Sequence, residues 1–597
     1  MKSYRADIDG LRAVAVLAVL LFHGFPDLLR GGFVGVDIFF VISGYLITGI
    51  LLSNLDEGRL RLFDFYRHRV RRIFPALAVV LAACFAFGWL VLFASEFAQL
   101  GKHIVASAAF VSNFALWGEA GYFDEASETK PLLHLWSLAV EEQFYLLWPP
   151  LLWLAWRFRF PLLSLAGLCV ALSFAACVIL AGRDATADFF SPIARFWEIL
   201  AGAMLVCAER SGFLNLGPTM GVGLSVAGAA LVCASIMLLG GSETYPGWRA
   251  AIPVLGSLLL LGAGPLALVN RWALAWRPLV AIGLISYPLY LWHWPLLAFA
   301  RVLAGSEPSM EARAALLAGS VALAALTFVA IEWPLRFGAY ATAKMALLCA
   351  SMAMIGAAGL DVWKRGGLPF RYIAEHTLPS GHAALDDSSP FVTNCTLPAA
   401  QPADGWCYAD KREPARYALL GDSHGEALFW ALVRTSQPNG RWLMAGRPGC
   451  TPMAEMQRVT RNERPDWPAD DPIKCASLNA AALASVLDNP SIRVVLIVTA
   501  RRLLEDEGYA AHMGEAPSEN GAFAGLSALV DALQHAGKRV IFLVDNPSVG
   551  ESSDCVPRRT GFALLDNWLS RFSDAICNLA FDEYAAAIKP YLEGFKH

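Results

Sequence analysis

The sequence has few charges for its length. Only 16% of its 597 residues are charged, whereas 56% are hydrophobic, and the mean hydropathy is +0.47. This excludes an ordinary soluble enzyme, in which about a quarter of the residues are charged. The net charge of −4 comes without a basic low-complexity tail, so no nucleic-acid partner is expected. The composition therefore indicates a polytopic membrane protein.

A cleavable signal peptide is also lacking. The first apolar run is long enough to span a bilayer, and no small-residue cleavage site precedes the polar turn at 26–32, so we expect it to remain as a helix. Residues 95–130 contain a partly apolar stretch that fits either a re-entrant helix or a helix on the membrane surface. Eleven apolar stretches approach the ~20 residues that a crossing requires: 11–29, 33–53, 73–94, 133–156, 161–181, 191–209, 218–240, 251–269, 278–300, 314–335 and 343–363.

Lysine and arginine gather on alternate turns between these stretches. They occur before the first stretch, and residues 54–72 hold six arginines, whereas the intervening short turns have few. Because cytoplasmic loops are enriched in Lys and Arg, the basic turns predict the cytoplasmic side. Eleven spans then place everything after residue 363 outside.

The composition changes after about residue 370. Short apolar runs at 416–420, 441–445, 493–499 and 539–545 read as buried strands. Helical patterns lie between them, so we expect an α/β domain with a parallel, flavodoxin-like sheet covered on both faces. The predicted domains are a membrane domain, a further transmembrane helix with its exit, a linker and an outer domain, at 1–340, 341–369, 370–415 and 416–597.

The cysteines divide evenly between the two parts. Six lie in apolar spans and are expected to be small core residues: Cys84, Cys169, Cys177, Cys207, Cys233 and Cys349. The other six lie in the outer part: Cys395, Cys407, Cys450, Cys475, Cys555 and Cys577. An even number of cysteines in an oxidising compartment predicts disulfides, and pairing of sequence neighbours is the simplest of the fifteen connectivities.

Two ionisable side chains share one face of the first predicted helix. Arg12 and His23 are eleven residues apart, which is about three turns and a rise of about 16 Å. Ionisable residues inside a membrane are costly and are functional candidates by default. The alternative for His23 is a packed histidine bonded to a backbone carbonyl.

Polar groups also gather near the third and fourth predicted spans. Arg69, Arg71 and Arg72 are either inside-facing anchors or bidentate ligands for phosphates at the membrane surface. Glu141 and Glu142 begin an apolar helix, where they either form a catalytic pair or lock helices together. Weaker candidates are an Arg195–Glu198 pair, a Glu332–Arg336 pair and His293 as an interfacial belt residue.

Five segments together resemble the membrane acyltransferase-three family over about residues 5–340: DGLRAVAVLAVLLFH, GVDIFFVISGYLIT, FYRHRVRRIFP, HLWSLAVEEQFYLLWP and ISYPLYLWHWP. The resemblance implies that His23 is the catalytic histidine and that Arg12, Arg69 and Arg72 contact acetyl-coenzyme A entering from the cytoplasm. Glu142 is expected among the catalytic residues. Further motif positions are matched by Asp37, Ser43, Tyr45 and His134.

The outer part contains the run YALLGDSHGE at 417–426. It predicts a strand that turns into a helix at Ser423, where a helix N-terminus stabilises an oxyanion. The alternative is a plain turn in which Asp422 or Ser423 caps the helix. The run resembles the SGNH hydrolase–transferase domain that is often fused to the acyltransferase-three unit. The resemblance implies Ser423 as nucleophile, with Gly446 or Gly449 as a second oxyanion donor.

The outer part departs from that family in two places. The usual Gly-x-Asn-Asp block is replaced by RVVLIVTAR at 493–501, and no late Asp-x-x-His is found. Asp531 and His535 have the wrong spacing and lie in a predicted helix, and His424 is a poor substitute because it adjoins Ser423. Either the domain is incomplete at its C-terminal end or it uses a different base.

Together these features predict an O-acetyltransferase of the bacterial inner membrane with a periplasmic C-terminal domain. It would move an acetyl group from cytoplasmic acetyl-coenzyme A, through His23 and then Ser423, to a glycan hydroxyl outside, without a metal. The acceptor classes are lipopolysaccharide O-antigen, an exopolysaccharide and peptidoglycan. The alternatives are a transporter with a glycan-binding outer domain and a glycan acetylesterase.

Overall fold

The computed structural model divides into two compact units. We call Met1–Ala120, Asp124–Thr377 and Val556–Ser573 the helical unit, and Gly121–Phe123, Leu378–Cys555 and Asp574–His597 the sheet unit. The structure describes residues 4–58, 60–119, 127–212, 218–240, 245–305, 307–373, 391–397, 406–411, 414–435, 441–447, 449–458, 472–500, 509–511, 521–543, 558, 560–563, 566–567 and 589.

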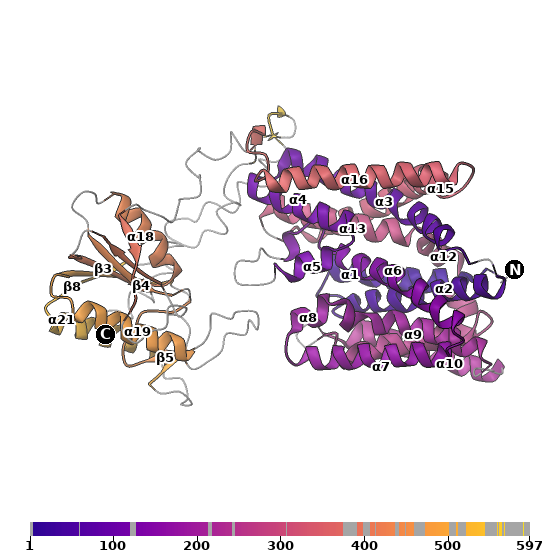
Figure 1. Ribbon diagram of the computed structural model, residues 1–597, viewed down its shortest axis with the longest axis horizontal. Helices are drawn as coiled ribbons and strands as arrows, with labels where there is room; N and C mark the ends of the chain where they lie inside the picture. Colours follow the sequence, from indigo (N-terminus) through magenta and orange to yellow (C-terminus); the bar gives the residue numbers. More distant parts are fainter. Residues whose placement is uncertain are drawn as a thin grey trace. The chain divides into compact units, whose positions relative to one another are not determined.

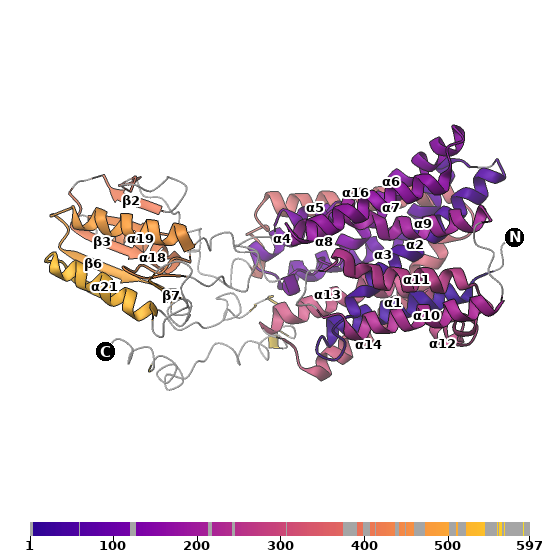
Figure 2. The same ribbon diagram turned by 90° about the horizontal axis from the view of Figure 1, so that it is seen from below.

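The helical unit is a bundle of long helices (Figures 1 and 2), in which α7 packs along α9, α10 along α11 and α4 along α16. Its α-helices are α1 (Ala6–Gly24), α2 (Gly35–Asp56), α3 (Leu62–Val91), α4 (Ala94–Ala108), α5 (Ser112–Trp117), α6 (Leu135–Arg157), α7 (Leu162–Ala181), α8 (Ala185–Phe190), α9 (Pro192–Arg210), α10 (Pro218–Leu238), α11 (Ala251–Ala263), α12 (Arg277–Leu284), α13 (Ser286–Ala304), α14 (Met310–Thr327), α15 (Trp333–Arg336) and α16 (Ala341–Lys364). Short 3₁₀ or π turns occur at Gly32–Val34, Ser127–Thr129, Gly247–Ala250, Asn270–Leu274 and Phe328–Glu332.

The prediction of eleven spans is not confirmed. Within the described residues, seven helices are long and apolar enough to cross a membrane, or eight if the bent pair α12–α13 forms one span. The pair bends by 67°, where the sequence predicted one span at 278–300. The span predicted at 251–269 is also cut short, because α11 ends at Ala263, where Gly264 follows with a φ of +82° and then Pro265.

Small residues bring α2 and α9 into close contact. A Cβ on Gly44 would lie 1.7 Å from the carbonyl oxygen of Ile199, and one on Gly202 would lie 2.0 Å from that of Val41. Such backbone approach is typical of helix packing in membranes, where small residues line the contact. This crossing fixes α2, which carries several of the predicted site residues, against α9.

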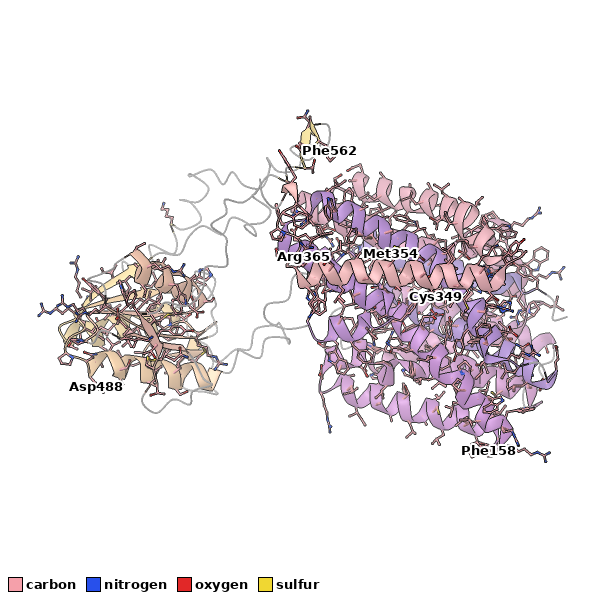
Figure 3. All side chains as sticks on the ribbon, turned by 45° about the horizontal axis from the view of Figure 1, so that its top comes forward. Phe158, Cys349, Met354, Arg365, Asp488 and Phe562 are labelled. Carbon is pink, nitrogen blue, oxygen red and sulfur yellow. A yellow bond between two sulfur atoms is a disulfide. The ribbon has the colours of Figure 1, made fainter. Side chains whose placement is uncertain are left out.

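Apolar side chains cover the outside of the helical unit. Figure 3 labels Met354 and Cys349 on α16; Met354 is 68% exposed and Cys349 is also exposed. Cys233 is exposed too, so the expectation that all six membrane cysteines are core residues is wrong for Cys233 and Cys349. An apolar exterior suits lipid, because a bilayer does not drive such side chains inward.

The sheet unit is a mixed six-stranded sheet in the order β1-β2-β4-β3-β6-β8. The four strands β4, β3, β6 and β8 are parallel, but β1 and β2 pair antiparallel at one edge, so the prediction of a parallel sheet holds only for the centre. The strands are β1 (Val392–Asn394), β2 (Trp406–Asp410), β3 (Tyr417–Gly421), β4 (Trp442–Gly446), β6 (Val494–Val498) and β8 (Arg539–Leu543), with a separate pair β5 (Gln457–Arg458) and β7 (Tyr509–Ala510).

Helices cover both faces of this sheet. In β3, Leu419 packs with α18 (Ser423–Thr435) on one face, and its neighbours Ala418 and Leu420 pack with α19 (Pro472–Leu487) and α21 (Gly521–His535) on the other. Figure 1 shows the helices on the two sides. Alternation along a strand places successive side chains on opposite faces, so both faces of a central strand are apolar. The four predicted strands are confirmed to within a few residues, and helices lie between them as predicted.

Two of the expected disulfides are present. Cys395 bonds to Cys407 and Cys450 bonds to Cys475, which confirms the pairing of sequence neighbours for these four cysteines. Cys555 and Cys577 lie outside the described residues.

Candidate functional site

A cavity of about 100 Å³ lies inside the helical unit, between α1, α2, α3, α6 and the start of α13. Its polar lining includes three arginines, two glutamates, two serines from α2 and α6, and three tyrosines. Five of the predicted site residues meet there although they come from four helices: Arg12, Ser43, Arg69, Arg72 and Glu142. The size suits a small group such as a thioester better than a whole nucleotide.

The three arginines differ in how the protein holds them. Arg12 lies 3.2 Å from Asp9, one turn earlier on α1, and the guanidinium of Arg69 lies 4.8 Å from the Tyr145 ring centroid. Among the described residues, Arg72 makes no hydrogen bond or ion pair. Unpaired guanidinium N–H groups bind phosphate or carboxylate oxygens bidentately, so this wall suits an anionic ligand.

Arg71 has a different role from its neighbours. Its Nε donates to the carbonyl of Leu335 at 3.1 Å and its side chain is buried. It therefore ties α3 to the end of α15. The expected Glu332–Arg336 pair also forms here, at 3.0 Å.

The two glutamates of α6 also differ. Glu141 accepts hydrogen bonds from the hydroxyls of Ser43 and Tyr145 through one oxygen. The Oε1 atom of Glu142 is buried and has no hydrogen-bond partner among the described residues. A buried polar atom without a partner is costly, so Glu142 is the carboxylate that remains available to a ligand.

Three histidines cluster beyond the cavity. Nδ1 of His23, in the last turn of α1, lies 3.0 Å from Nε2 of His293, and the two rings are nearly parallel. The ring of His134 packs edge-on against His293, with centroids 5.7 Å apart. His293 is fully buried, so its interpretation as an interfacial belt residue is wrong. The sequence signal that pointed to it was a lone histidine within an aromatic run, which does not reveal which way the ring faces.

Tyr290 stands between the cavity and the histidines. It lines the cavity, its hydroxyl lies 2.7 Å from Ser137 Oγ, and its carbonyl lies 2.7 Å from Nδ1 of His293. His23 itself does not line the cavity. The predicted arginines and the predicted histidine are therefore linked through Tyr290 and His293, rather than sharing one wall.

Two other motif residues lie away from the cavity. Asp37 is buried against Arg195, at 3.0 Å, and accepts a hydrogen bond from Tyr245 at 2.5 Å. The expected Arg195–Glu198 pair is confirmed, with 2.9 Å between Nη1 and Oε1, although its geometry is not that of a hydrogen bond. The Tyr45 hydroxyl lies 3.2 Å from a Glu209 oxygen.

In the sheet unit, Ser423 begins α18 directly after β3. Asp422 is fully buried and is the N-cap: its Oδ1 accepts from the His424 N–H at 2.9 Å, and its Oδ2 from the Ala500 N–H at 2.7 Å. The capping alternative is thus correct for Asp422. It leaves Ser423 half-buried at the carboxyl end of the sheet, where ligands bind in doubly wound folds.

The geometry around Ser423 leaves its base unassigned. Gly449 has a φ of +72°, in the loop that follows β4. His535 closes α21, and its Nδ1 lies 2.7 Å from the carbonyl of Asp531 on the same helix, as expected of residues in a helix. His424 is exposed.

These features define a polytopic membrane protein with a buried basic cavity and a doubly wound domain carrying a serine at a strand-to-helix turn. Residues 5–331 match the family model of an acyltransferase domain, and residues 394–596 match that of an SGNH domain fused to such domains. The chain therefore belongs to the acyltransferase-three membrane family and carries an SGNH domain.

Several curated proteins are similar to this chain. The peptidoglycan O-acetyltransferase OatA of Listeria monocytogenes is 33% identical over 354 residues, which are 56% of each chain. The putative peptidoglycan O-acetyltransferase YrhL of Bacillus subtilis is 32% identical over 49% of each chain. The putative membrane-bound transacylase BcsY of Komagataeibacter xylinus is 31% identical over 55% of this chain and 83% of its own. The match to the first two thus spans about half of their length. No solved structure matches.

Proposed function

We propose that this protein is a membrane O-acyltransferase that moves an acetyl group from cytoplasmic acetyl-coenzyme A to a glycan hydroxyl outside the inner membrane. One observation carries the proposal: the cavity that holds Arg12, Arg69, Arg72 and Glu142 is walled by Tyr290, whose carbonyl bonds the ring paired with His23. A phosphate-binding wall therefore lies next to a candidate base.

The donor enters from the side on which the basic residues gather. Arg69 and Arg72 lie near the start of α3, and Arg12 lies in the second turn of α1, which follows the basic N-terminus. The positive-inside rule places both ends in the cytoplasm. The guanidinium groups hold the phosphates at this end, and the narrow cavity takes the acyl-bearing arm.

His23 acts as the general base. It takes the proton of an acceptor hydroxyl as that oxygen bonds the acyl carbon, and it returns the proton to the coenzyme sulfur as the thioester C–S bond breaks. The Ser423 hydroxyl then attacks the resulting ester, which frees the first acceptor hydroxyl, and the Ser423 ester passes the acyl group to a sugar hydroxyl; this divides one transfer into two easier steps. The N-terminus of α18 stabilises the oxyanions that form on transfer to and from Ser423.

Peptidoglycan is the acceptor that the relatives favour. The Listeria protein is named for this glycan, and so is the putative Bacillus protein. The sequence alone does not distinguish peptidoglycan from lipopolysaccharide O-antigen or an exopolysaccharide as the acceptor. The match covers about half of each relative, so the acceptor is the part of the proposal that the assay must decide.

The test is transfer of label from acetyl-coenzyme A to glycan in membranes that contain the full chain. We expect wild type to label the sugar, His23→Ala to give no label, and Arg72→Ala to give little label unless acetyl-coenzyme A is raised, while both variants still insert. Matched controls are His68→Ala and Arg67→Ala; His68 is exposed, and Arg67 pairs with Asp64 at 2.8 Å outside the cavity. If the membranes instead remove acetate that the glycan already carries, the protein is an esterase. If acetate is neither added nor removed, the transporter alternative is favoured.

A further inference from the structure

We propose that His293 is a positioning residue that fixes the tautomer of His23 and so leaves Nε2 of His23 as the basic nitrogen. This inference rests on the proposed function of His23. It starts from two contacts of one ring: His293 Nδ1 lies 2.7 Å from the Tyr290 carbonyl, and His293 Nε2 lies 3.0 Å from His23 Nδ1.

The first contact settles which nitrogen of His293 carries a proton. A carbonyl oxygen only accepts hydrogen bonds, so Nδ1 of His293 must be the donor. In a neutral imidazole the other nitrogen is then an acceptor, so Nε2 of His293 carries a lone pair. That lone pair points at Nδ1 of His23.

The second contact transmits this choice to His23. Because Nε2 of His293 accepts, Nδ1 of His23 must donate, and Nε2 of neutral His23 is left without a proton. Among the described residues, no carboxylate lies within hydrogen-bond distance of either ring, so nothing there would compensate a positive charge on the pair. The hydrogen bonds that run from the Tyr290 carbonyl through His293 to His23 are therefore consistent with one arrangement of protons: Nδ1 of each histidine carries the proton.

Packing holds the two rings in this arrangement. His293 is fully buried in α13, its ring lies nearly parallel to that of His23, with an interplanar angle of 10° and centroids 5.2 Å apart, and the Trp294 ring meets His23 edge-on at 4.5 Å. Trp294 in turn donates its indole N–H to the Lys130 carbonyl at 2.8 Å. The rings cannot flip without breaking these contacts, so the tautomer is set by the fold. His293 itself does not line the cavity.

The structure therefore predicts a separation of kinetic constants. In membranes with the full chain, His293→Leu removes the acceptor at similar volume and should lower kcat by about 100-fold, the lower range of general-base contributions. KM for acetyl-coenzyme A should stay within about 3-fold, since His293 is not at the cavity wall. His293→Gln keeps an acceptor and should retain most of the activity. Equal activity of the Leu and Gln variants, or a loss expressed only in KM, would overturn the inference.

A spectroscopic measurement tests the tautomer without any assay of transfer. The full chain is labelled with ¹⁵N-histidine in lipid nanodiscs, and the His23 signals are assigned by their absence in His23→Gln. We expect Nδ1 of His23 to be protonated and Nε2 unprotonated in wild type, and both tautomers to appear in His293→Leu. A protonated Nε2 in wild type, or an unchanged spectrum in the variant, would contradict the inference. If wild type transfers no acetyl group, the proposed function fails, and this spectrum still decides the tautomer.

Discussion

Arg558 donates hydrogen bonds to both carboxylate oxygens of Glu96, at 2.7 and 2.8 Å. Arg558 follows the strands of the sheet unit in the chain, yet it belongs to the helical unit. Its guanidinium also donates to the Val91 carbonyl and lies 4.1 Å from the centroid of the Phe93 ring. A buried, bidentate pair with a backbone ligand fixes this late segment to the junction of α3 and α4.

Breaking this pair should weaken the helical unit. Removal of one partner from a buried ion pair leaves the other uncompensated, and typically costs about 3–5 kcal/mol. We expect Arg558→Gln to lower the melting temperature in detergent by several degrees. The double variant Arg558→Gln/Glu96→Gln should melt at nearly the same temperature as Arg558→Gln alone. The control is Arg365→Gln, directly after α16 (Figure 3), because the 3.5 Å pair of Arg365 with Asp361 is exposed and worth little. An equal loss in the control would contradict this account.

Asp37 bonds Arg195 and Tyr245 in the helical unit and does not line the cavity, so we expect it to have a structural role. Asp37→Asn should therefore reduce the folded yield and the melting temperature, with a cost of about 3 kcal/mol or more. The kcat of the protein that remains folded should be close to that of wild type. A stable variant with no activity would instead place Asp37 in the reaction.

Asp422 and Ser423 are neighbours whose substitution should have opposite effects. Asp422 bonds the His424 and Ala500 N–H groups and the Thr499 hydroxyl, so Asp422→Ala should destabilise the sheet unit by about 2 kcal/mol or more. Ser423→Ala removes no hydrogen bond that the structure shows for the sheet, and should leave its unfolding unchanged while abolishing transfer. Chemical denaturation of each variant, followed by the transfer assay, separates the two roles. Full transfer by Ser423→Ala would exclude it as nucleophile.

Glu119 gives the helical unit a pH dependence. It follows α5, which is not among the candidate spans, and lies 2.9 Å from His103, 2.6 Å from Lys102 and 3.1 Å from Lys130. Burial would raise the pKa of Glu119, but the hydrogen bonds and charges of these neighbours outweigh it, and the pKa lies well below its usual range.

A depressed carboxylate pKa stabilises the fold above the unfolded pKa of about 4.3 and loses that contribution as the pH falls through the folded value. The melting temperature of Glu119→Gln should therefore lie below that of wild type at pH 7. The difference should shrink steadily as the pH is lowered from 5 toward 2. A constant difference over this range would show that the charge of Glu119 is not its cause.

The sequence was sufficient for most of the sheet and for five of the residues that line the cavity. The runs that became β3, β4 and β6 are continuous and apolar because both faces of these strands are covered. The run that became β8 is also apolar, although this strand ends the described sheet and is partly exposed. The antiparallel strands β1 and β2 were missed, since β1 has only three residues and neither strand stands out as an apolar run.

Contacts between distant parts of the chain could not be predicted from the sequence. The partner of Asp37 is 158 residues away, and that of His23 is 270 residues away. Helical periodicity shows which residues share a face, but not which helix that face meets. This is why His293 was interpreted as a surface residue, although its ring is the one that bonds His23.

The most direct test of the whole account is the transfer of labelled acetyl groups by membranes containing wild type, Arg72→Ala, His23→Ala and the matched controls Arg67→Ala and His68→Ala. The account predicts labelled glycan with wild type and both controls. Arg72→Ala should need far more acetyl-coenzyme A for the same rate, and His23→Ala should give no label at any concentration. Full labelling by His23→Ala, at the rate of wild type, would contradict it.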